Sequence, residues 1–286
     1  MQTQFSLAYP DSPKKEWIIK ESDDAFTATE EFNGILEAWA GYRGLASKIR
    51  RFLKKYPWHF DAMCHYALCK QDEGKVIEAF AFAHAAVAQA ENSFPTEFEE
   101  EHHLIPGGYI ENRPFLRCLV NLMVIQSEVG ELSESIATGF RVLSFDPEDR
   151  MGARLELPKS LIRAGQNRKA VDLFENPMYE GSFYATIYLY PVALLNLGRE
   201  AEARLAIEDC LTKPRIAKYI LNPDLPRPEP EKIPFLGMTS GSEIEGYHYA
   251  AQFRRFWREG GKAFELLRES SREAESQGWP AFMSGK

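Results

Sequence analysis

Apolar side chains recur at helical spacing through the middle of the chain. Leu119, Leu122 and Met123 stand three and four residues apart, so in a helix they share one face. Ala170 and Phe174 repeat the four-residue interval. The apolar-polar alternation typical of half-buried strands is lacking, so this pattern predicts a chain dominated by α-helices.

Four segments share one arrangement: an apolar helical stretch, a central glycine and a second stretch that opens with charged residues. Their glycines are Gly74, Gly130, Gly165 and Gly198, at intervals of 56, 35 and 33 residues. The last two intervals are close to the roughly 34-residue period of tetratricopeptide repeats. The first interval equals one such period plus about 22 residues, which predicts an insertion at about 94–115 between the first two repeats.

The residues around these glycines resemble the tetratricopeptide repeat family. First helices of that family carry a large residue and then a large and a small one, as at Met63, Tyr66 and Ala67. Second helices carry a small residue four positions before a larger one, as at Ala170 and Phe174. Each repeat is degenerate, and the register shared by all four carries the resemblance over about 45–217. It implies an all-α solenoid of helical hairpins, whose stacking buries a continuous core; the alternative is an irregular helical bundle.

The segments on either side of the repeats differ in composition. Residues 1–24 are polar and irregular, which predicts a flexible arm, and 25–217 form the repeat region, with two helices expected from Ala25 to Tyr56. Residues 218–286 begin with a proline-rich linker and continue with two helices that would cap the solenoid. Ser242 followed by Glu245 is a candidate capping box for the first of them.

The insertion contains two features of interest. Its segment E-N-R-P-F-L, residues 111–116, resembles one in a group of uncharacterised bacterial tetratricopeptide proteins, which have no established activity. Asn112 is a candidate helix cap and Pro114 suits a first turn. The run from Glu99 to His103 offers metal-binding side chains, but adjacent ligands rarely converge on one ion, so no metal and no other cofactor are expected.

Charge and composition narrow the function. The chain has 286 residues and a net charge of −8, which disfavours general binding to nucleic acid or to an anionic membrane. Its four cysteines are widely spread, which favours a reducing compartment. The start lacks the pattern of a signal peptide, and the longest apolar run, residues 118–125, is too short to span a bilayer. We therefore expect a cytoplasmic protein.

One basic segment stands out within this acidic chain. The sequence S-K-I-R-R-F-L-K-K-Y-P, residues 47–57, carries five cations around Ile49, Phe52 and Leu53. Such a run can contact a membrane or a nucleic acid. It is more typical of the solvated face of a terminal helix.

No catalytic motif is present: the sequence has no G-x-S-x-G, no phosphate-binding loop and no recognised histidine motif. The family resemblance implies instead that first helices line a concave face that binds proteins or extended peptides. The residues it places there as candidates for partner binding are Arg117, Asn121, Lys159, Arg163 and Tyr188. Three basic side chains and one aromatic would suit a segment with carboxylates.

Alternatives to that hypothesis stay open. The proline-rich stretch 222–234 is a competing occupant of the concave face, and the insertion at 94–115 is a second location for a binding site. A structural subunit that self-associates through its solenoid is the alternative function. Pro158 and Pro191 fall at the same position of two first helices, which predicts either two kinked helices or two helices that begin there.

Overall fold

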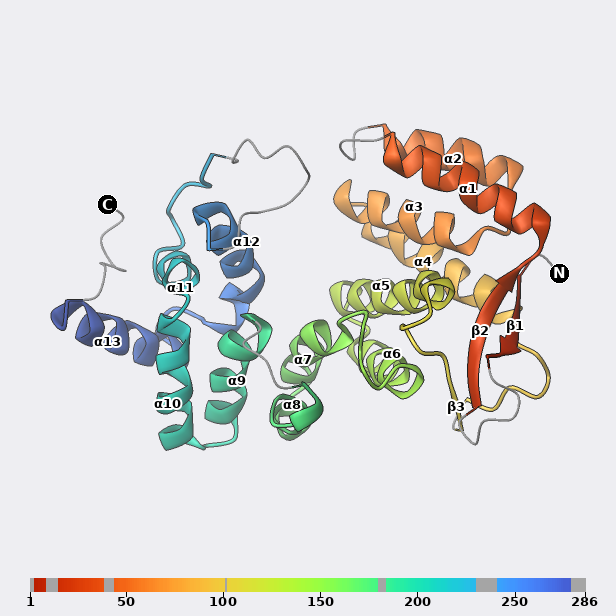
Figure 1. The fold of residues 1–286 in the computed structure, drawn as a ribbon. Coiled ribbons are helices and arrows are strands. Elements are labelled where there is room, and N and C mark those ends of the chain that lie inside the picture. Colours follow the sequence, from red (N-terminus) through yellow and green to blue (C-terminus); the bar gives the residue numbers. More distant parts are fainter. Residues whose placement is uncertain are drawn as a thin grey trace. The chain divides into compact units, whose positions relative to one another are not determined.

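The computed structural model describes residues 3–8, 15–38, 44–100, 102–179, 184–229 and 241–278. The chain folds into two compact units, Met1–Ala164 and Gly165–Lys286, each built mainly of packed helices (Figure 1). The predicted all-α, tetratricopeptide-like class of helical hairpins is confirmed. No helix in the described ranges combines the length and apolar character needed to cross a bilayer.

The first unit contains a small sheet and seven α-helices among its described residues (Figure 1). In chain order its elements are β1 (Thr3–Leu7), β2 (Lys15–Glu21), α1 (Asp23–Glu37), α2 (Leu45–Lys55), α3 (Phe60–Asp72), α4 (Val76–Glu91), β3 (His103–Leu104), the 3₁₀ helix η1 (Ile110–Asn112), α5 (Arg113–Val129), α6 (Leu132–Phe145) and α7 (Ala153–Arg163). The two helices expected between Ala25 and Tyr56 are therefore present as α1 and α2.

The described part of the second unit contains helices and no strand. Its elements are α8 (Asn167–Phe174), the 3₁₀ helix η2 (Pro177–Tyr179), α9 (Tyr184–Asn196), α10 (Glu200–Leu211), α11 (Pro214–Leu221), α12 (Glu243–Phe253), the 3₁₀ helix η3 (Arg254–Phe256) and α13 (Lys262–Ser276). Pro158 and Pro191 lie inside α7 and α9, so neither helix begins at its proline.

The glycines that mark the repeats lie between helices, as predicted. Gly74, Gly130, Gly165 and Gly198 all have positive φ, at 72°, 96°, 73° and 75°. Only glycine adopts this left-handed conformation without steric cost. Each of these glycines therefore follows the end of one helix and precedes the start of the next.

A compact apolar cluster holds the first three helices together. Phe32 from α1, Ile49 and Phe52 from α2 and Tyr66 from α3 are all buried in it. Ile49 and Phe52 are three residues apart and so share the inner face of α2. Burying each of these large side chains stabilises the unit by about 1.5–3 kcal/mol.

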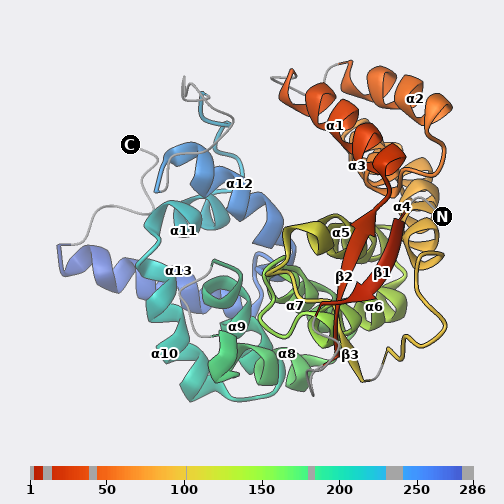
Figure 2. The same cartoon turned by 45° about the vertical axis from the view of Figure 1, so that its right-hand side comes forward.

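The N-terminal segment is not the flexible arm that the sequence predicted. Strands β1 and β2 form an antiparallel hairpin in which Phe5 pairs with Ile19, and the two strands lie side by side in both views (Figure 2). Phe5 and Trp17 are only 1% and 2% exposed. The Phe5 ring lies 4.6 Å from that of Phe94, so burial against the insertion orders a segment that local composition marks as irregular.

The insertion is fixed to this hairpin by strand pairing and by one amide. β3 pairs in parallel with β2 at Lys15 and Glu16. Asn112 begins α5 without a side-chain cap, contrary to expectation; its Oδ1 accepts from Ile19 N at 3.0 Å, and its Nδ2 donates to the carbonyl oxygens of Trp17 at 2.8 Å and Pro106 at 3.0 Å. Pro114 lies in the first turn of α5, as predicted.

The two helices expected near the C-terminus are α12 and α13, which pack against α9, α10 and α11. Half of the predicted capping box is present: Ser242 Oγ accepts from Glu245 N at 3.2 Å, but the Glu245 carboxylate accepts from Gly241 N instead of Ser242 N. Of the proline-rich stretch, 222–229 is described and contains no helix. Residues 230–234 lie outside the described ranges, so whether the stretch occupies the concave face stays untested.

Candidate functional site

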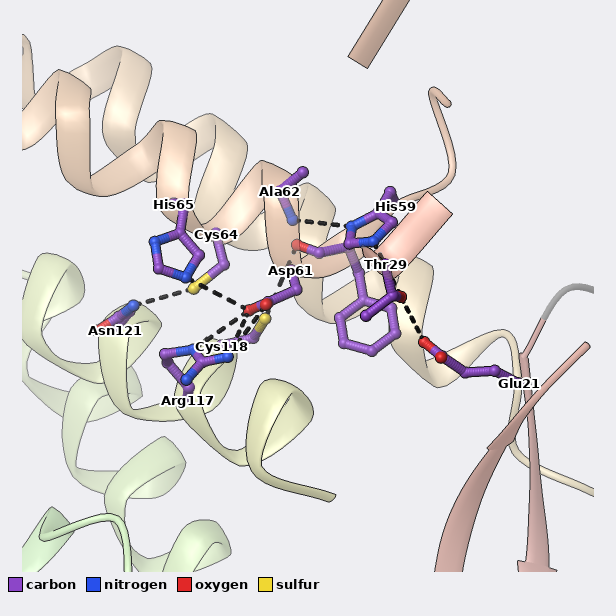
Figure 3. Close-up of polar contacts among 11 residues, drawn as sticks. Glu21, Thr29, His59, Asp61, Ala62, Cys64, His65, Arg117, Cys118 and Asn121 are labelled. Carbon is purple, nitrogen blue, oxygen red and sulfur yellow. Dashed lines mark hydrogen bonds and ion pairs between the residues drawn. The ribbon is translucent and has the colours of Figure 1, made fainter. Parts of the chain in front are cut away.

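Six polar or sulfur-bearing side chains meet between α3 and α5, and we call them the α3–α5 polar cluster (Figure 3). They are Asp61, Cys64 and His65 from α3 and Arg117, Cys118 and Asn121 from α5. On each helix the outer members are four residues apart and so share a face. The family resemblance named two of them, Arg117 and Asn121, as candidates for partner binding, and the structure brings both into this cluster.

An ion pair between the two helices forms the centre of the cluster. Arg117 Nη2 donates to both carboxylate oxygens of Asp61 at 3.0 Å, and Nε donates to Oδ1 at 3.2 Å. Burial lowers the pKa of Arg117, but the adjacent Asp61 carboxylate more than offsets this, so the pKa is raised overall. The Asp61 carboxylate offsets the guanidinium charge, so Arg117 is not the free cation that the sequence suggested.

The sulfur atoms beside this pair are shielded. Asn121 Nδ2 donates to Cys64 Sγ at 2.9 Å, and Cys118 is buried with its pKa raised well above the ordinary value by burial and by Cys64. All four cysteines of the chain are free and buried, as expected of small apolar side chains.

The cluster also contains donors of the kind that bind zinc. Ligand atoms of Asp61, Cys64 and Cys118 all lie within 4.8 Å of one another, and thiolate and carboxylate are both zinc ligands. However, the Arg117 guanidinium places a positive charge against both Asp61 oxygens. The raised pKa of Cys118 makes its thiol a poor ligand. The chemistry of the set therefore favours an ion pair over a metal site.

A hydrogen-bond chain runs from the cluster's helix to the hairpin (Figure 3). His59 begins α3, and its Nδ1 accepts from Ala62 N at 3.1 Å, so the ring is neutral and its proton is on Nε2. That nitrogen lies 3.3 Å from Thr29 Oγ1, which donates to Glu21 Oε1 at 2.7 Å. Burial lowers the pKa of His59. This chain fixes β2, α1 and α3 relative to one another.

These three elements, with η1 and the start of α5, enclose a groove of about 660 Å³, which we call the N-terminal groove. Arg117 and Asp61 border it, so it adjoins the polar cluster. Two large apolar side chains line it and are open to solvent: Phe26 is 58% exposed and Ile110 is 70% exposed. The groove thus combines apolar walls with a few fixed polar groups, which is the usual composition of a binding site.

Two of the other predicted residues lie on α7 and are already bonded. Lys159 is 7% exposed, and its Nζ donates to the Glu156 carboxylate at 2.8 and 2.9 Å. Arg163 Nη1 donates to the carbonyl oxygen of Ser127 at 2.5 Å and to its Oγ at 2.8 Å. Asp61 and Glu156 thus neutralise Arg117 and Lys159, whereas Arg163 keeps its charge but is held by Ser127.

The prediction that Tyr188 offers an apolar anchor to a partner is wrong. Its side chain is 0% exposed, and the ring stacks on Phe253 with centroids 5.8 Å apart. Its hydroxyl donates to the carbonyl oxygens of Cys210 and Lys213 at 2.8 and 3.0 Å. Trp257 Nε1 donates to the Tyr188 carbonyl oxygen at 2.8 Å. The C-terminal segment covers this position, so Tyr188 belongs to the core of the second unit.

The acidic and histidine run in the insertion has structural partners. Glu100 accepts from Arg141 Nη2 at 2.8 Å, and His103 Nδ1 accepts from Glu99 N at 2.8 Å. The His103 ring lies 5.5 Å from that of Trp17. Glu101 lies outside the described residues. The prediction that this run binds no metal stays a prediction.

Sequence reasoning did not identify the walls of the groove. Phe26 and Ile110 are isolated apolar residues in helical or loop segments, and nothing local marks them as neighbours of one cavity. The one useful signal was the insertion itself, which was named as a second location for a binding site. Its residues Ile110, Glu111, Arg113 and Pro114 do line the groove.

The family model described as Transcriptional repressor TCF25 matches residues 46–261, which is well over half of the chain. No curated protein matches the sequence. The comparisons do not test the likeness of the E-N-R-P-F-L segment to bacterial proteins, and it stays a prediction.

Solved structures similar to this chain include the following three. A crystal structure of MamA is 12% identical, covers 68% of this chain and 95% of its own, and has a TM-score of 0.46. The TPR-like repeats of a putative kinesin light chain of Podosopora anserina are 19% identical, cover 78% and 98%, and score 0.43. Naa15/Naa10 bound to HypK-THB is 14% identical, covers 88% of this chain and 35% of its own, and scores 0.42.

Proposed function

The chain belongs to the Transcriptional repressor TCF25 family, and we propose that it is a protein-interaction scaffold without catalytic activity. The observation that supports this most is the N-terminal groove, where Phe26 and Ile110 remain 58% and 70% exposed beside a cavity of about 660 Å³. Exposed apolar side chains that gather at one cavity are typical of binding surfaces.

The proposed ligand is an extended segment of a partner protein. Its apolar side chains would pack between Phe26 and Ile110, and its polar groups would meet the Asp61–Arg117 pair where the groove adjoins the α3–α5 polar cluster. Asn112 already binds the Trp17 carbonyl oxygen and the Ile19 N–H of β2, the central strand of the sheet. A guest strand cannot use those two groups, so recognition rests on side chains rather than on extension of the sheet.

Of the residues first proposed to bind a partner on the concave face, only some remain candidates. Arg117 and Asn121 remain candidates because they lie in the polar cluster beside the groove, whereas Lys159 and Arg163 are held by Glu156 and Ser127. The net charge of −8 makes protein a better partner than DNA. A role in transcriptional repression, which the family name suggests, would then act through protein contacts.

The experiment compares two matched double variants in capture of partner proteins from cells that produce the chain. Phe26→Ser with Ile110→Ser removes the apolar walls of the groove. Ile77→Ser with Leu205→Ser removes two side chains that are 75% and 66% exposed elsewhere. Capture should be lost with the groove variant and kept with the control. Equal capture by both variants would place the binding site elsewhere.

The alternative is a structural subunit that self-associates through the same apolar side chains. Light scattering of the purified chain separates the two functions. A stable dimer that dissociates in the groove variant and persists in the control variant would favour self-association, whereas a monomer in both supports the scaffold.

The location of the chain in the cell is a separate proposal. The predicted cytoplasmic location rests on the sequence, while the reference to transcription in the family name adds the nucleus. Microscopy of the fluorescently tagged chain in its own cell distinguishes them.

A further inference from the structure

A second cavity, separate from the N-terminal groove, is lined mainly by cations. It has a volume of about 480 Å³ and lies between α2, α3 and the start of α4. Arg50, Arg51 and Lys54 from α2 line it, together with Lys70, Glu73 and Lys75. We call it the α2–α3 basic pocket. It shares no lining residue with the N-terminal groove.

Helical geometry explains why these cations converge. α2 buries Leu45, Ile49 and Phe52 against the core of the first unit. Arg50, Arg51 and Lys54 therefore lie on its exposed surface. The end of α3 and the turn after it bring Lys70 and Lys75 to the same cavity.

The single carboxylate of the pocket does not neutralise it. Glu73 accepts from Lys70 Nζ and from Lys75 Nζ, both at 2.8 Å, and these bonds lower the pKa of Glu73 to about 2. One carboxylate thus accepts hydrogen bonds from two lysines. In total, five cationic side chains and one carboxylate line the cavity. Throughout the described ranges, no acidic side chain pairs with Arg50, Arg51 or Lys54.

We propose that the α2–α3 basic pocket binds a short acidic segment of a protein, supplied by carboxylates or by phosphorylated side chains. Cations gathered around one cavity produce a stronger field than the same cations spread over a surface. Arginine also binds carboxylate or phosphate oxygens through two parallel hydrogen bonds. The sequence interpretation of this run as a solvated helix face does not account for its convergence on a cavity.

An acidic protein segment fits the pocket better than a nucleic acid. Binding to a nucleic acid extends over many phosphates, whereas these cations surround one cavity in a chain whose net charge is −8. Single strands also need aromatic rings on which bases stack. Among the described residues, Tyr66 is the one aromatic that lines the pocket, and it is 8% exposed and packs in the core.

The test uses the full chain and labelled peptides in fluorescence anisotropy. The probes are an oligoglutamate peptide, a counterpart with phosphoserines and a glutamine counterpart, with an oligonucleotide as the competing class. Arg50→Glu with Arg51→Glu reverses the charge of two residues that line the pocket. Arg258→Glu with Arg272→Glu makes the same change of net charge at exposed residues of the second unit. If the Arg50→Glu, Arg51→Glu variant fails to fold, Arg50→Gln with Arg51→Gln is used in its place.

The oligoglutamate or phosphoserine peptide should bind and the glutamine peptide should not. The pocket variant should weaken binding about tenfold or more, while the control variant binds like the parent chain. Binding should also weaken as salt rises from about 50 to about 300 mM, because screening shortens the range of the field. The tighter of the two acidic probes identifies the source of the charge.

Three results would overturn the proposal: no binding of either acidic peptide, equal loss in both variants, or preference for the oligonucleotide. The groove variant of Phe26 and Ile110 leaves the pocket intact and serves as a further reference. Because the pocket and the groove share no residue, failure of one proposal leaves the other standing.

Discussion

Arg117 and Tyr188 were both predicted to line the inner face of a repeat, but the two side chains differ in their exposure to solvent. The Arg117 side chain is 34% exposed and borders the N-terminal groove. Tyr188 is 0% exposed beneath Phe253 and Trp257. The repeat pattern thus identifies a helix face, but later segments of the chain decide whether that face is open. In the second unit Phe253 of α12 and Trp257 cover it.

The largest expected effect comes from Tyr188→Ala. This change removes a buried ring and leaves the carbonyl oxygens of Cys210 and Lys213 without their donor. It should lower the free energy of unfolding of the second unit by about 3–5 kcal/mol, as measured by urea denaturation. Tyr190→Ala, on the same helix, removes a partly exposed side chain and should cost much less. Equal stability of the two variants would show that the face in the second unit is open after all.

A smaller effect is expected when the ion pair of the first unit is reversed. Arg117→Glu sets a second carboxylate beside Asp61, which is mostly buried. We expect a loss of about 1–3 kcal/mol, less than for a fully buried pair because solvent reaches Arg117. Asp61→Arg with Arg117→Glu restores opposite charges and should recover part of the loss in a double-mutant cycle. Arg117→Glu without any loss of stability would mean that the pair contributes nothing to the fold.

The smallest expected effect concerns pH. Burial lowers the pKa of His59 and of His65 below the ordinary value of 6.5. As pH falls below about 6.5 the unfolded chain takes up protons that the folded unit does not, so the free energy of unfolding decreases until the folded pKa is reached. His59→Asn keeps an acceptor at the start of α3 but does not titrate. Between about pH 7 and pH 5, the free energy of unfolding of this variant should fall less than that of the parent chain. An identical dependence on pH in the two chains would contradict this role of His59.

The helix pairs were predictable because their signals are local. The period of the glycines predicted the breaks at Gly74, Gly130, Gly165 and Gly198, and all four have the positive φ that such breaks require. The family geometry also placed Arg117 and Asn121 on one helix face, and both lie in the α3–α5 polar cluster. Within a helix pair, register alone decides which side chains meet.

The hairpin and the groove were not predictable because they depend on distant contacts. Phe5 is ordered by Phe94 and Phe115, which are far along the chain. Asn112 bonds the backbone of β2 instead of capping its own helix. Tyr188 is buried by residues of the C-terminal segment. Composition near each residue carries no information about such partners.

Hydrogen exchange of the full chain, with and without a captured partner protein, tests the central claim most directly. If the N-terminal groove is the binding site, amides at 18–21, in α1 around Phe26 and at 110–117 should exchange more slowly in the complex. Amides of α9 should exchange at the same rate with and without the partner. Slower exchange confined to α9, with 18–21 and 110–117 unchanged, would contradict the account.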